Sequence, residues 1–276
     1  MKPVIVTCLN NRPAVSEIML LCAKRLGLEV YAAYTETQDL LLLDAYNANS
    51  VQHHNMPGAK WNAALKLALD SDATHFLIMG DDDSLSSEGY DKLYLSASYG
   101  NDYVGFKSNA YVELTTGNAM RHDYHYKCDK LIGAGRMISR RAIEAVSYAA
   151  TVLIKREGLP GRCMIKGEHA SLHPEVAKYL IAYGFVAAEI PPTYIGLWPN
   201  DRKSALDHWS ELRLVMGGFV PKAVDDGAIH VTDFKSEINI WPYSSLEAKC
   251  KKIHPSEAVW FLGKEEREII YKWVVK

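Results

Sequence analysis

Three consecutive carboxylates, Asp81, Asp82 and Asp83, come directly after a short apolar run over residues 76–79. An apolar run of this length is typical of a strand that is buried on both faces. Adjacent carboxylates repel one another and resist removal from water, so their position at the end of a buried strand requires a counter-charge. Hard oxygen ligands at this spacing suit magnesium or manganese. The pattern therefore predicts a divalent-cation site, and the alternative is a solvated Asp-rich loop that caps a helix beginning near Ser86.

The elements around the three aspartates alternate between strand and helix. Strands are predicted at residues 4–9, 29–35 and 51–54 and directly before Asp81, and helices at 13–26, 40–46 and 57–69. This alternation predicts an α/β fold with a mainly parallel sheet, right-handed crossovers and flanking helices. Ligands of such sheets bind beyond the carboxyl ends of the strands. Thr7, Asn10, Glu36 and the three aspartates all fall at those ends, which predicts that they share one site.

Composition excludes several classes of protein. The chain has 276 residues, of which 48% are hydrophobic and 23% charged, as expected for a soluble globular protein with a sizeable core. Its net charge of -2 argues against a nucleic-acid footprint over the whole protein. The five cysteines are scattered without CxxC spacing, which predicts reduced thiols in a cytoplasmic protein and no zinc or disulfide framework. Neither a signal peptide nor a transmembrane segment is expected, because the first strand begins at once and no apolar run is long enough.

Two common nucleotide-binding motifs are missing from the sequence. No GxGxxG follows the first strand, and GxxxxGK[ST] occurs nowhere. A nucleotidyltransferase on a similar sheet would carry a glycine-rich basic loop directly after the first strand, and residues 9–13 supply none. A phosphohydrolase with an aspartate nucleophile would carry its acidic pair on the first strand. Both classes are therefore disfavoured.

Three segments together resemble nucleotide-sugar glycosyltransferases of the GT-A fold, with family 2 as the nearest type: residues 7–12, residues 60–65 and the strand that ends in Asp81–Asp83. In that family the first loop and the end of the second strand hold the nucleoside. A basic residue before the acidic strand faces the diphosphate, and an Asp-x-Asp (DXD) motif holds the metal and the ribose. The resemblance implies a Rossmann-like GT-A sheet. It also implies transfer of a hexosyl or pentosyl group from a nucleotide-sugar, with a UDP-sugar as the expected donor and Mn²⁺ or Mg²⁺ as the cofactor.

The resemblance also implies roles for individual residues. The donor-binding residues that it implies are Thr7, Leu9, Asn10, Arg12, Glu36, Lys60, Asp81 and Asp82. Glu36 takes the place of the acidic residue after the second strand, and Lys60 that of the basic residue. Asp83 is the best metal ligand, and the spacing leaves open whether Asp81 or Asp82 is its partner. His208 is a further candidate for the metal shell.

The resemblance covers residues 4–200 and implies a division of the chain. Residues 1–200 are expected to form the GT-A domain, with a nucleotide-sugar-binding half at 1–115 and an acceptor half at 116–200. Residues 201–276 are expected to form a C-terminal, mostly helical appendage. The polar loop at 196–203 marks the boundary, either as an exposed linker or as a loop that folds over a bound diphosphate.

The general base departs from the family pattern. Family 2 enzymes carry a Glu-Asp pair before a helix, and the Asp position of that pair falls on His173 in this sequence. Glu168 is the nearest upstream carboxylate, and a Glu or a His can deprotonate an acceptor hydroxyl. The candidates are therefore Glu168, His169 and His173, although a histidine before a proline also serves as a helix cap. A non-catalytic binding protein on the same fold is the alternative that the missing pair leaves open.

The acceptor is indicated only by charge. Residues 121–166 carry ten Lys or Arg against four Asp or Glu, which describes either a solvated face or the binding surface of a polyanion. One candidate acceptor is the hydroxymethylated base of bacteriophage DNA, which would make the protein a DNA-modification enzyme. A glycan, a lipid-linked acceptor and a small molecule are the alternatives. Glycines at 133 and 135 either line the acceptor side of the cleft or form a tight turn.

Overall fold

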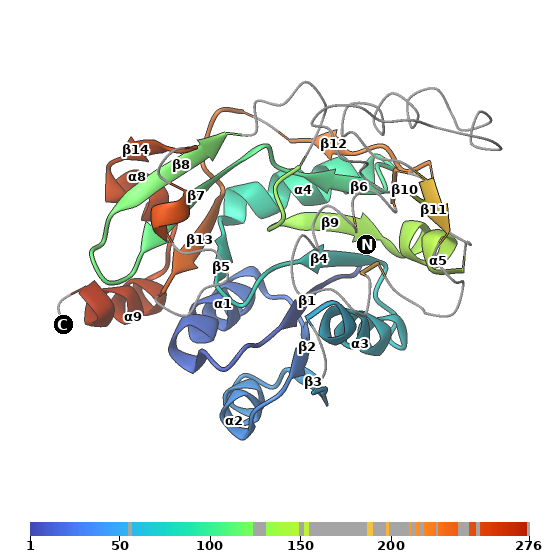
Figure 1. Cartoon of the computed structure of the whole chain (residues 1–276), viewed down its shortest axis with the longest axis horizontal. Coiled ribbons are helices and arrows are strands. Elements are labelled where there is room, and N and C mark those ends of the chain that lie inside the picture. The colour runs from blue at the N-terminus through green and yellow to red at the C-terminus, as the bar shows by residue number, and fades with distance from the viewer. Residues whose placement is uncertain are drawn as a thin grey trace.

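The computed structural model describes residues 1–54, 57–123, 131–148 and 249–274. Between these it describes the shorter ranges 152–154, 187–189, 197–198, 210, 214–215, 218–224, 226–236 and 243–246. The described part is a mixed α/β fold with two larger sheets and a two-stranded one (Figure 1). The predicted α/β class is confirmed. None of the described helices is both long enough and apolar enough to span a bilayer.

The first sheet has seven strands in the order β12-β6-β9-β4-β1-β2-β3. Their bounds are β1 Pro3–Cys8, β2 Val30–Tyr34, β3 Asn49–Gln52, β4 His75–Ile78, β6 Tyr103–Gly105, β9 Arg136–Ser139 and β12 Lys222–Ala223. The strands β3, β2, β1 and β4 run parallel to one another, and β9 runs antiparallel between β4 and β6. The sheet is therefore mainly parallel, and the carboxyl ends of β1, β2 and β4 meet at one edge, as predicted.

Helices cover both faces of this sheet. They are α1 Pro13–Leu26, α2 Thr37–Ala45, α3 Pro57–Leu69, α4 Ser87–Ser98 and α5 Arg140–Tyr148. Because successive side chains of a strand point to opposite faces, Val4 and Val6 of β1 pack in the same core as α3 and α5, whereas Ile5 packs with α1 and α4. In Figure 1, α1 and α3 accordingly flank β1 on opposite sides. The continuous apolar runs of the sequence are thus explained by burial on both faces.

The second sheet has five strands in the order β14-β8-β7-β13-β5. Their bounds are β5 Asp83–Leu85, β7 Ser108–Glu113, β8 Ala119–Asp123, β13 Val231–Lys235 and β14 Lys251–Ile253. β13 pairs parallel with β7 and antiparallel with β5. The acidic segment therefore joins the two sheets, since it leaves β4 in the first sheet and enters β5 in the second. The remaining strands, β10 Val152–Ile154 and β11 Ala187–Glu189, pair with each other.

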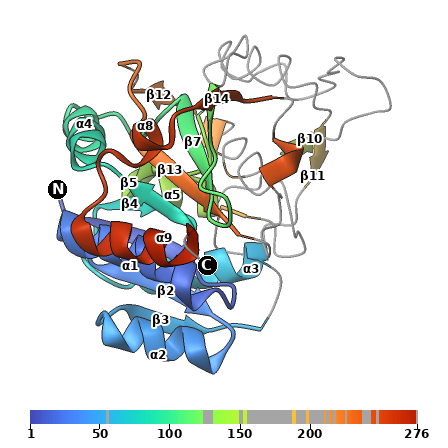
Figure 2. The same cartoon turned by 90° about the vertical axis from the view of Figure 1, so that its left-hand side faces the viewer.

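Residues after position 200 contribute to both larger sheets. β12 lies at one edge of the first sheet, and β13 lies inside the second. The described helices of this stretch are the 3-10 helix η2 Tyr243–Ser245, α8 Pro255–Val259 and α9 Lys264–Val274. Figure 2 shows α9 alongside α1. The division of the chain at residue 200 stays a prediction, but part of its second section is built into the sheet that carries the acidic segment.

A buried carboxylate on α9 fastens that helix to the strand that begins at Asp83. Glu266 is 1% exposed and accepts hydrogen bonds from Ser84 Oγ at 2.9 Å and from the backbone N–H of Gly263 at 2.7 Å. Arg25 of α1 donates from Nε to the same carboxylate at 3.0 Å. The neighbouring pair of Lys24 and Glu265, by contrast, lies on the surface at 3.2 Å. The two adjacent ion pairs therefore differ mainly in burial.

We expect Glu266→Ala to lower the free energy of unfolding by about 3 kcal/mol, because it leaves the partly buried Arg25 guanidinium without its partner. The matched control Glu265→Ala should cost less than about 1 kcal/mol, since exposed pairs contribute little. Urea unfolding of the two variants measures the difference. Equal effects would contradict the buried role of Glu266.

Candidate functional site

The loop after β4 folds back onto the loop after β1, and an arginine joins them. The Arg12 guanidinium pairs with Asp81 through Nη2 and with Asp82 through Nη1, the second contact at 3.0 Å. Asp81 also accepts from Ser16 Oγ at 3.0 Å and from the Asn10 backbone N–H at 3.2 Å. Asp81 is thus fully engaged by α1 and the loop before it, and it anchors the two loops to each other.

Asp83 faces a carboxylate from a distant part of the chain. The antiparallel register of β5 and β13 makes Asp83 and Asp233 direct partners. One carboxylate oxygen from each of Asp82, Asp83 and Asp233 lies within 4.8 Å of the others, and we call these three residues the acidic cluster. Lys235 Nζ donates to Asp233 Oδ2 at 2.6 Å. The cluster therefore brings together two of the predicted aspartates and one that was not predicted.

A glycine allows the acidic loop to close on itself. The Gly80 backbone N–H donates to Asp83 Oδ2 at 2.6 Å. A Cβ at Gly80 would lie 2.8 Å from Asp82 Oδ1 and 2.9 Å from Asp83 Oδ2. Cβ atoms in proteins essentially never come this close to another heavy atom. Only glycine therefore fits at this position while the two carboxylates keep their places.

The charges around the acidic cluster do not balance. Among the described residues, Asp81, Asp82, Asp83 and Asp233 face the cations Arg12 and Lys235, so within this part of the chain the negative charges exceed the positive ones by two when all six groups are ionised. Burial, together with Asp233 and Asp82, raises the pKa of Asp83 well above its usual range. Burial also raises the pKa of Asp233 to about 7, against the opposing effect of Lys235. Without a further cation, the cluster therefore holds protons at pH values where exposed aspartates are ionised.

The other two aspartates show the effect of Arg12. Burial acts to raise the pKa of Asp82, but Arg12 and Lys235 outweigh it and the net shift is downward. For Asp81 burial prevails over Arg12, so its pKa is raised.

A divalent cation fits the acidic cluster. Three carboxylates converge, the excess charge is two, and Asp233 Oδ1 is buried without a hydrogen-bond partner among the described residues. Carboxylate oxygens are the ligands that Mg²⁺ and Mn²⁺ prefer.

Beside the cluster, the loop after β1 is held by a buried lysine. The Lys60 side chain is 3% exposed, and its ammonium donates to the carbonyl oxygen of Leu9 and to Asn10 Oδ1. The sequence resemblance implied that Lys60 faces the diphosphate, whereas its contacts are with the protein. Within the described part of the chain, Lys60 is therefore placed to shape the loop that carries Leu9 and Asn10.

The buried acid next to this loop is Asp39, not Glu36. Glu36 is exposed at the N-terminal end of α2, whereas Asp39 is fully buried and accepts from the Asn11 backbone N–H at 3.1 Å. Asp39 Oδ1 and the Oγ1 of buried Thr7 lack hydrogen-bond partners among the described residues. Together with Asp39, the Thr7 hydroxyl offers unused polar atoms near the carboxyl ends of β1 and β2.

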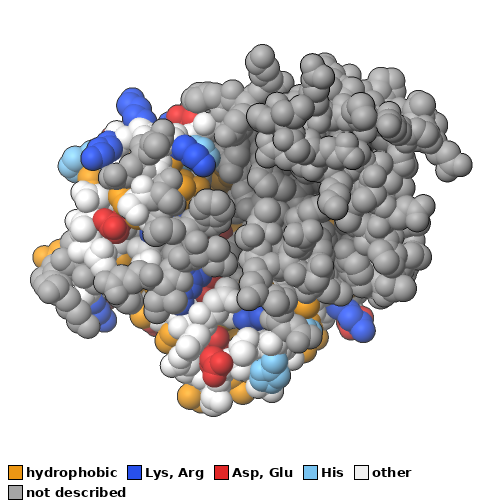
Figure 3. Space-filling view, in the orientation of Figure 1, with side chains coloured by type: hydrophobic (Ala, Val, Ile, Leu, Met, Phe, Trp, Pro, Cys, Tyr) orange, Lys and Arg blue, Asp and Glu red, His pale blue; other side chains and the backbone are white. Residues whose placement is uncertain are grey.

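Four of the predicted residues lie outside the described residues: Glu168, His169, His173 and His208. Of the basic segment 121–166, four arginines are described, and each is engaged within the protein. Arg136 is 2% exposed and donates to the carbonyl oxygens of Ile132 and Leu131. The others bond to backbone carbonyls or carboxylates, with Arg121 contacting Asp123, Arg140 contacting Ala73, Leu69 and Ser71, and Arg141 contacting Asp102. On the face seen in Figure 3, the described Lys and Arg side chains are scattered among acidic ones and form no single patch.

The glycine stretch before β9 is a tight turn in the structure. Gly135 has φ 69°, and its N–H donates to the carbonyl oxygen of Ile78 at 2.9 Å. A Cβ there would lie 3.0 Å from Val231 Cγ2. The turn thus packs β13 against β4. This supports the prediction that these glycines form a tight turn over the alternative that they line the acceptor side of the cleft.

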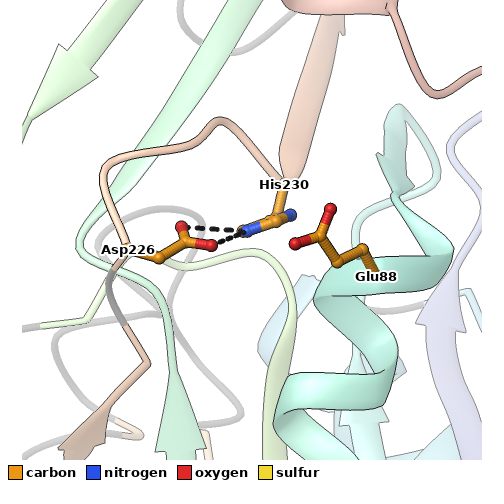
Figure 4. A group of neighbouring side chains, drawn as sticks. All are labelled: Glu88, Asp226 and His230. Carbon is orange, nitrogen blue, oxygen red and sulfur yellow. Dashed lines mark hydrogen bonds and ion pairs between the residues drawn. The ribbon is translucent and has the colours of Figure 1, made fainter.

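A second group of charged residues lies between α4 and the start of β13 (Figure 4). His230 is 1% exposed, its Nδ1 lies 2.8 Å from Ser86 Oγ, and its Nε2 lies 3.1 Å from Asp226 Oδ1. Lys92 pairs with Asp226 and with Glu88, the latter at 2.8 Å, so its ammonium compensates one of the two carboxylate charges.

The group of Ser86, His230 and Asp226 is unsuited to nucleophilic catalysis. The Ser86 hydroxyl is fully buried and accepts from the Gly89 N–H at 2.8 Å as the cap of α4. The Ser86, His230 and Asp226 side chains therefore hold β13 against α4 and do not form an accessible catalytic triad.

Comparison with known proteins finds similarity in structure only. No family model matches the sequence, and no curated protein matches it. The similar solved structures include S. aureus TarS, at 12% identity over 86% of this chain and 37% of that one, with a TM-score of 0.48. S. aureus TarS 1-349 in complex with UDP-GlcNAc matches at 15% identity over 87% of this chain and 60% of that one, with a TM-score of 0.42.

A third similar structure is CMP:2-keto-3-deoxy-manno-octonic acid synthetase complexed with CTP, at 11% identity over 90% of this chain and 96% of that one, with a TM-score of 0.40. This chain thus spans 37% and 60% of the two TarS chains. Two of these three structures were solved in complex with UDP-GlcNAc or CTP.

Proposed function

We propose that this chain is a metal-dependent glycosyltransferase that moves a sugar from a nucleotide-sugar to an acceptor hydroxyl. The observation that carries the proposal is the acidic cluster, in which the Asp82, Asp83 and Asp233 carboxylates converge within 4.8 Å of one another. The cluster adjoins the loop after β1, through the pairs of Arg12 with Asp81 and Asp82. The acidic cluster and this loop are thus contiguous at the carboxyl edge of the parallel strands, where ligands of such sheets bind.

Asp82, Asp83 and Asp233 would hold Mn²⁺ or Mg²⁺. When bound, the cation would neutralise charge on the leaving diphosphate. Asp81, which the sequence suggested as a ligand, instead fixes Arg12 and the loop after β1. His208 stays a predicted further ligand.

The nucleoside would bind over the loop after β1. Thr7, Leu9 and Asn10 would line the nucleoside pocket, and Lys60 donates to oxygens of the loop that carries Leu9 and Asn10. Asp39 would take the place of the acidic residue after the second strand, which the resemblance gave to Glu36. The expected donor is a UDP-sugar, carrying a hexose or a pentose. Binding both ends of the donor on fixed loops would present the anomeric carbon to the acceptor, which is the positioning contribution to catalysis.

The contacts of the four described arginines in the basic segment 121–166 help to choose among the candidate acceptors. The four described arginines of the basic segment bond to the protein itself, so they offer less to DNA phosphates than their number suggests. We therefore favour a glycan, a lipid-linked or a small-molecule acceptor over the hydroxymethylated base of phage DNA.

A donor screen tests the proposal. UDP-, GDP-, ADP- and CMP-sugars would be incubated with the protein and Mn²⁺, and release of the free nucleotide would be followed with and without EDTA. We expect slow, EDTA-sensitive hydrolysis of one UDP-sugar, which then serves to screen acceptors. Absence of both hydrolysis and binding for every donor would contradict the proposal.

We expect Glu168→Gln to lower turnover by about two to four orders of magnitude while UDP binding persists, because a general base acts on the acceptor and not on the donor. Steady-state rates with the identified acceptor, with UDP calorimetry as control, measure this. Full activity in Glu168→Gln combined with loss in His173→Ala or His169→Ala would move the role to histidine. Activity in all three variants would argue for a retaining mechanism, which the anomeric configuration of the product reports.

A further inference from the structure

The acidic cluster has a lysine of its own. Lys235 follows Asp233 by two residues on β13, so both side chains lie on the same face of that strand. Its ammonium donates to Asp233 Oδ2 at 2.6 Å and lies 5.2 Å from the centre of the Tyr111 ring. The side chain is 9% exposed.

Within the described part of the chain, the Lys235 ammonium has more unused hydrogen-bond donors than the Lys60 ammonium. Lys60 donates to two oxygens, and the Arg12 guanidinium is fixed by two carboxylates. A lysine ammonium carries three N–H donors, yet within the described part of the chain Lys235 meets one hydrogen-bond acceptor, Asp233. A buried ammonium with unused donors favours a further anionic oxygen beside it.

The position of Lys235 identifies the chemistry of that anion. A cation on the acidic cluster would compete with Lys235 for the Asp233 carboxylate and leave the ammonium needing another partner. A ligand that contacts the divalent cation and the ammonium at the same time needs anionic oxygens, and several such oxygens favour simultaneous contact with both. A diphosphate meets this requirement, whereas a neutral sugar or a nucleoside does not.

We propose that the Lys235 ammonium binds a diphosphate oxygen of the nucleotide donor, next to the cation held by Asp82, Asp83 and Asp233. This inference rests on the proposed function. The acceptor hydroxyl oxygen forms a bond to the anomeric carbon and its proton goes to a general base, while the bond between the anomeric carbon and the diphosphate oxygen breaks and its electron pair remains on that oxygen. Lys235 then stabilises the added charge by hydrogen bonding, with no transfer of its proton. The role that the sequence gave to Lys60 thus passes to a residue from the far end of the chain.

The test replaces Lys235 by methionine, which keeps the length of the side chain and removes the charge. Calorimetry would measure the affinity for Mn²⁺ alone, for UDP at saturating Mn²⁺, and for uridine. We expect Lys235→Met to bind Mn²⁺ as tightly as the wild type or more tightly, because a positive charge leaves the cluster. UDP should bind about 10- to 100-fold more weakly, and uridine should bind equally well.

Two further variants complete the design. Lys235→Arg restores the positive charge and should recover most of the UDP affinity, and Lys222→Met removes an exposed lysine of β12 and should change nothing. Unchanged UDP affinity in Lys235→Met would overturn the inference, because Lys235 would then be only a counter-ion of Asp233. Equal losses for UDP and uridine would overturn it as well, since they would indicate a structural role. If the wild type bound neither Mn²⁺ nor UDP, the proposed function would fail first and this inference with it.

Discussion

Asp83→Asn is expected to abolish sugar transfer and to weaken Mn²⁺ binding at least about 100-fold, the upper end of what loss of a mere supporting partner costs a metal site. Asparagine keeps an oxygen that can accept the Gly80 N–H, so the turn of the acidic loop should survive. What it removes is a charge buried opposite Asp233. Thermal unfolding of the metal-free variant should show no loss of stability, because burial and the neighbouring carboxylates disfavour an ionised Asp83.

The matched control for this variant is Asp91→Asn, which removes an exposed carboxylate from α4. It should retain both Mn²⁺ affinity and turnover. Wild-type Mn²⁺ affinity in Asp83→Asn would exclude Asp83 from the cation site and leave the acidic loop as a structural turn.

The second substitution with a large expected effect is Asp233→Asn, which should change how the free energy of unfolding depends on pH. Burial raises the pKa of Asp233 to about 7 from its ordinary value of 3.8. The folded chain therefore retains a proton that the unfolded chain releases, and the stability that this provides is present below pH 3.8 and lost as the pH rises through about 7. Asp233→Asn cannot ionise, so in EDTA it should be more stable than the wild type at pH 8, on the order of 2–4 kcal/mol.

Near pH 4 the same two proteins should unfold at nearly the same urea concentration, because Asp233 is then protonated in the wild type. Titrating groups outside the acidic cluster are common to both proteins and cancel in the comparison, whereas the pKa of Asp83 and the pKa of Lys235 both depend on Asp233. The ion pair with Lys235 acts to lower the pKa of Asp233, and the raised pKa is the net result after this opposing effect. Loss of the ion pair in Asp233→Asn therefore needs no separate allowance. A variant less stable than the wild type at pH 8 would show that the Asp233–Lys235 ion pair, and not the excess of negative charge, dominates the cluster.

Local patterns in the sequence predicted the parallel half of the fold. The apolar run of β1 and the alternation through α3 gave the carboxyl edge of the sheet, and with it the position of Asp83. These features depend on neighbours in sequence, which periodicity reports directly. The predicted elements at residues 40–46 and 51–54 correspond to α2 Thr37–Ala45 and β3 Asn49–Gln52, which begin two or three residues earlier.

Asp233 could not be found in the same way. Its strand reads Val231, Thr232, Asp233, Phe234, Lys235, a short run without strict alternation of apolar and polar residues. What makes Asp233 a site residue is its pairing with Asp83 across the register of β5 and β13, and no local pattern specifies which distant strands pair. Two charged residues at alternate positions of an otherwise apolar strand were the available signal.

Lys60, Arg12 and Asp39 show a second reason why the sequence alone did not predict the whole site. A sequence displays which residues carry charge but not which charges satisfy one another. Lys60 and Arg12 are held by loop oxygens and by carboxylates, and Asp39 rather than Glu36 reaches the loop because α2 turns it inward. Assignment of donor-facing roles by position in the chain cannot anticipate such internal pairing.

The most direct measurement is a titration of Mn²⁺ in the presence of UDP, with free Mn²⁺ followed by electron paramagnetic resonance, on the wild type and on Asp233→Asn. If Asp82, Asp83 and Asp233 hold the cation, the wild type should bind one Mn²⁺ per chain, more tightly with UDP than without. Asp233→Asn should bind it at least about tenfold more weakly. Equal Mn²⁺ binding by the two proteins, or a wild type that binds none, would contradict the assignment of this cluster as the metal centre of a glycosyltransferase.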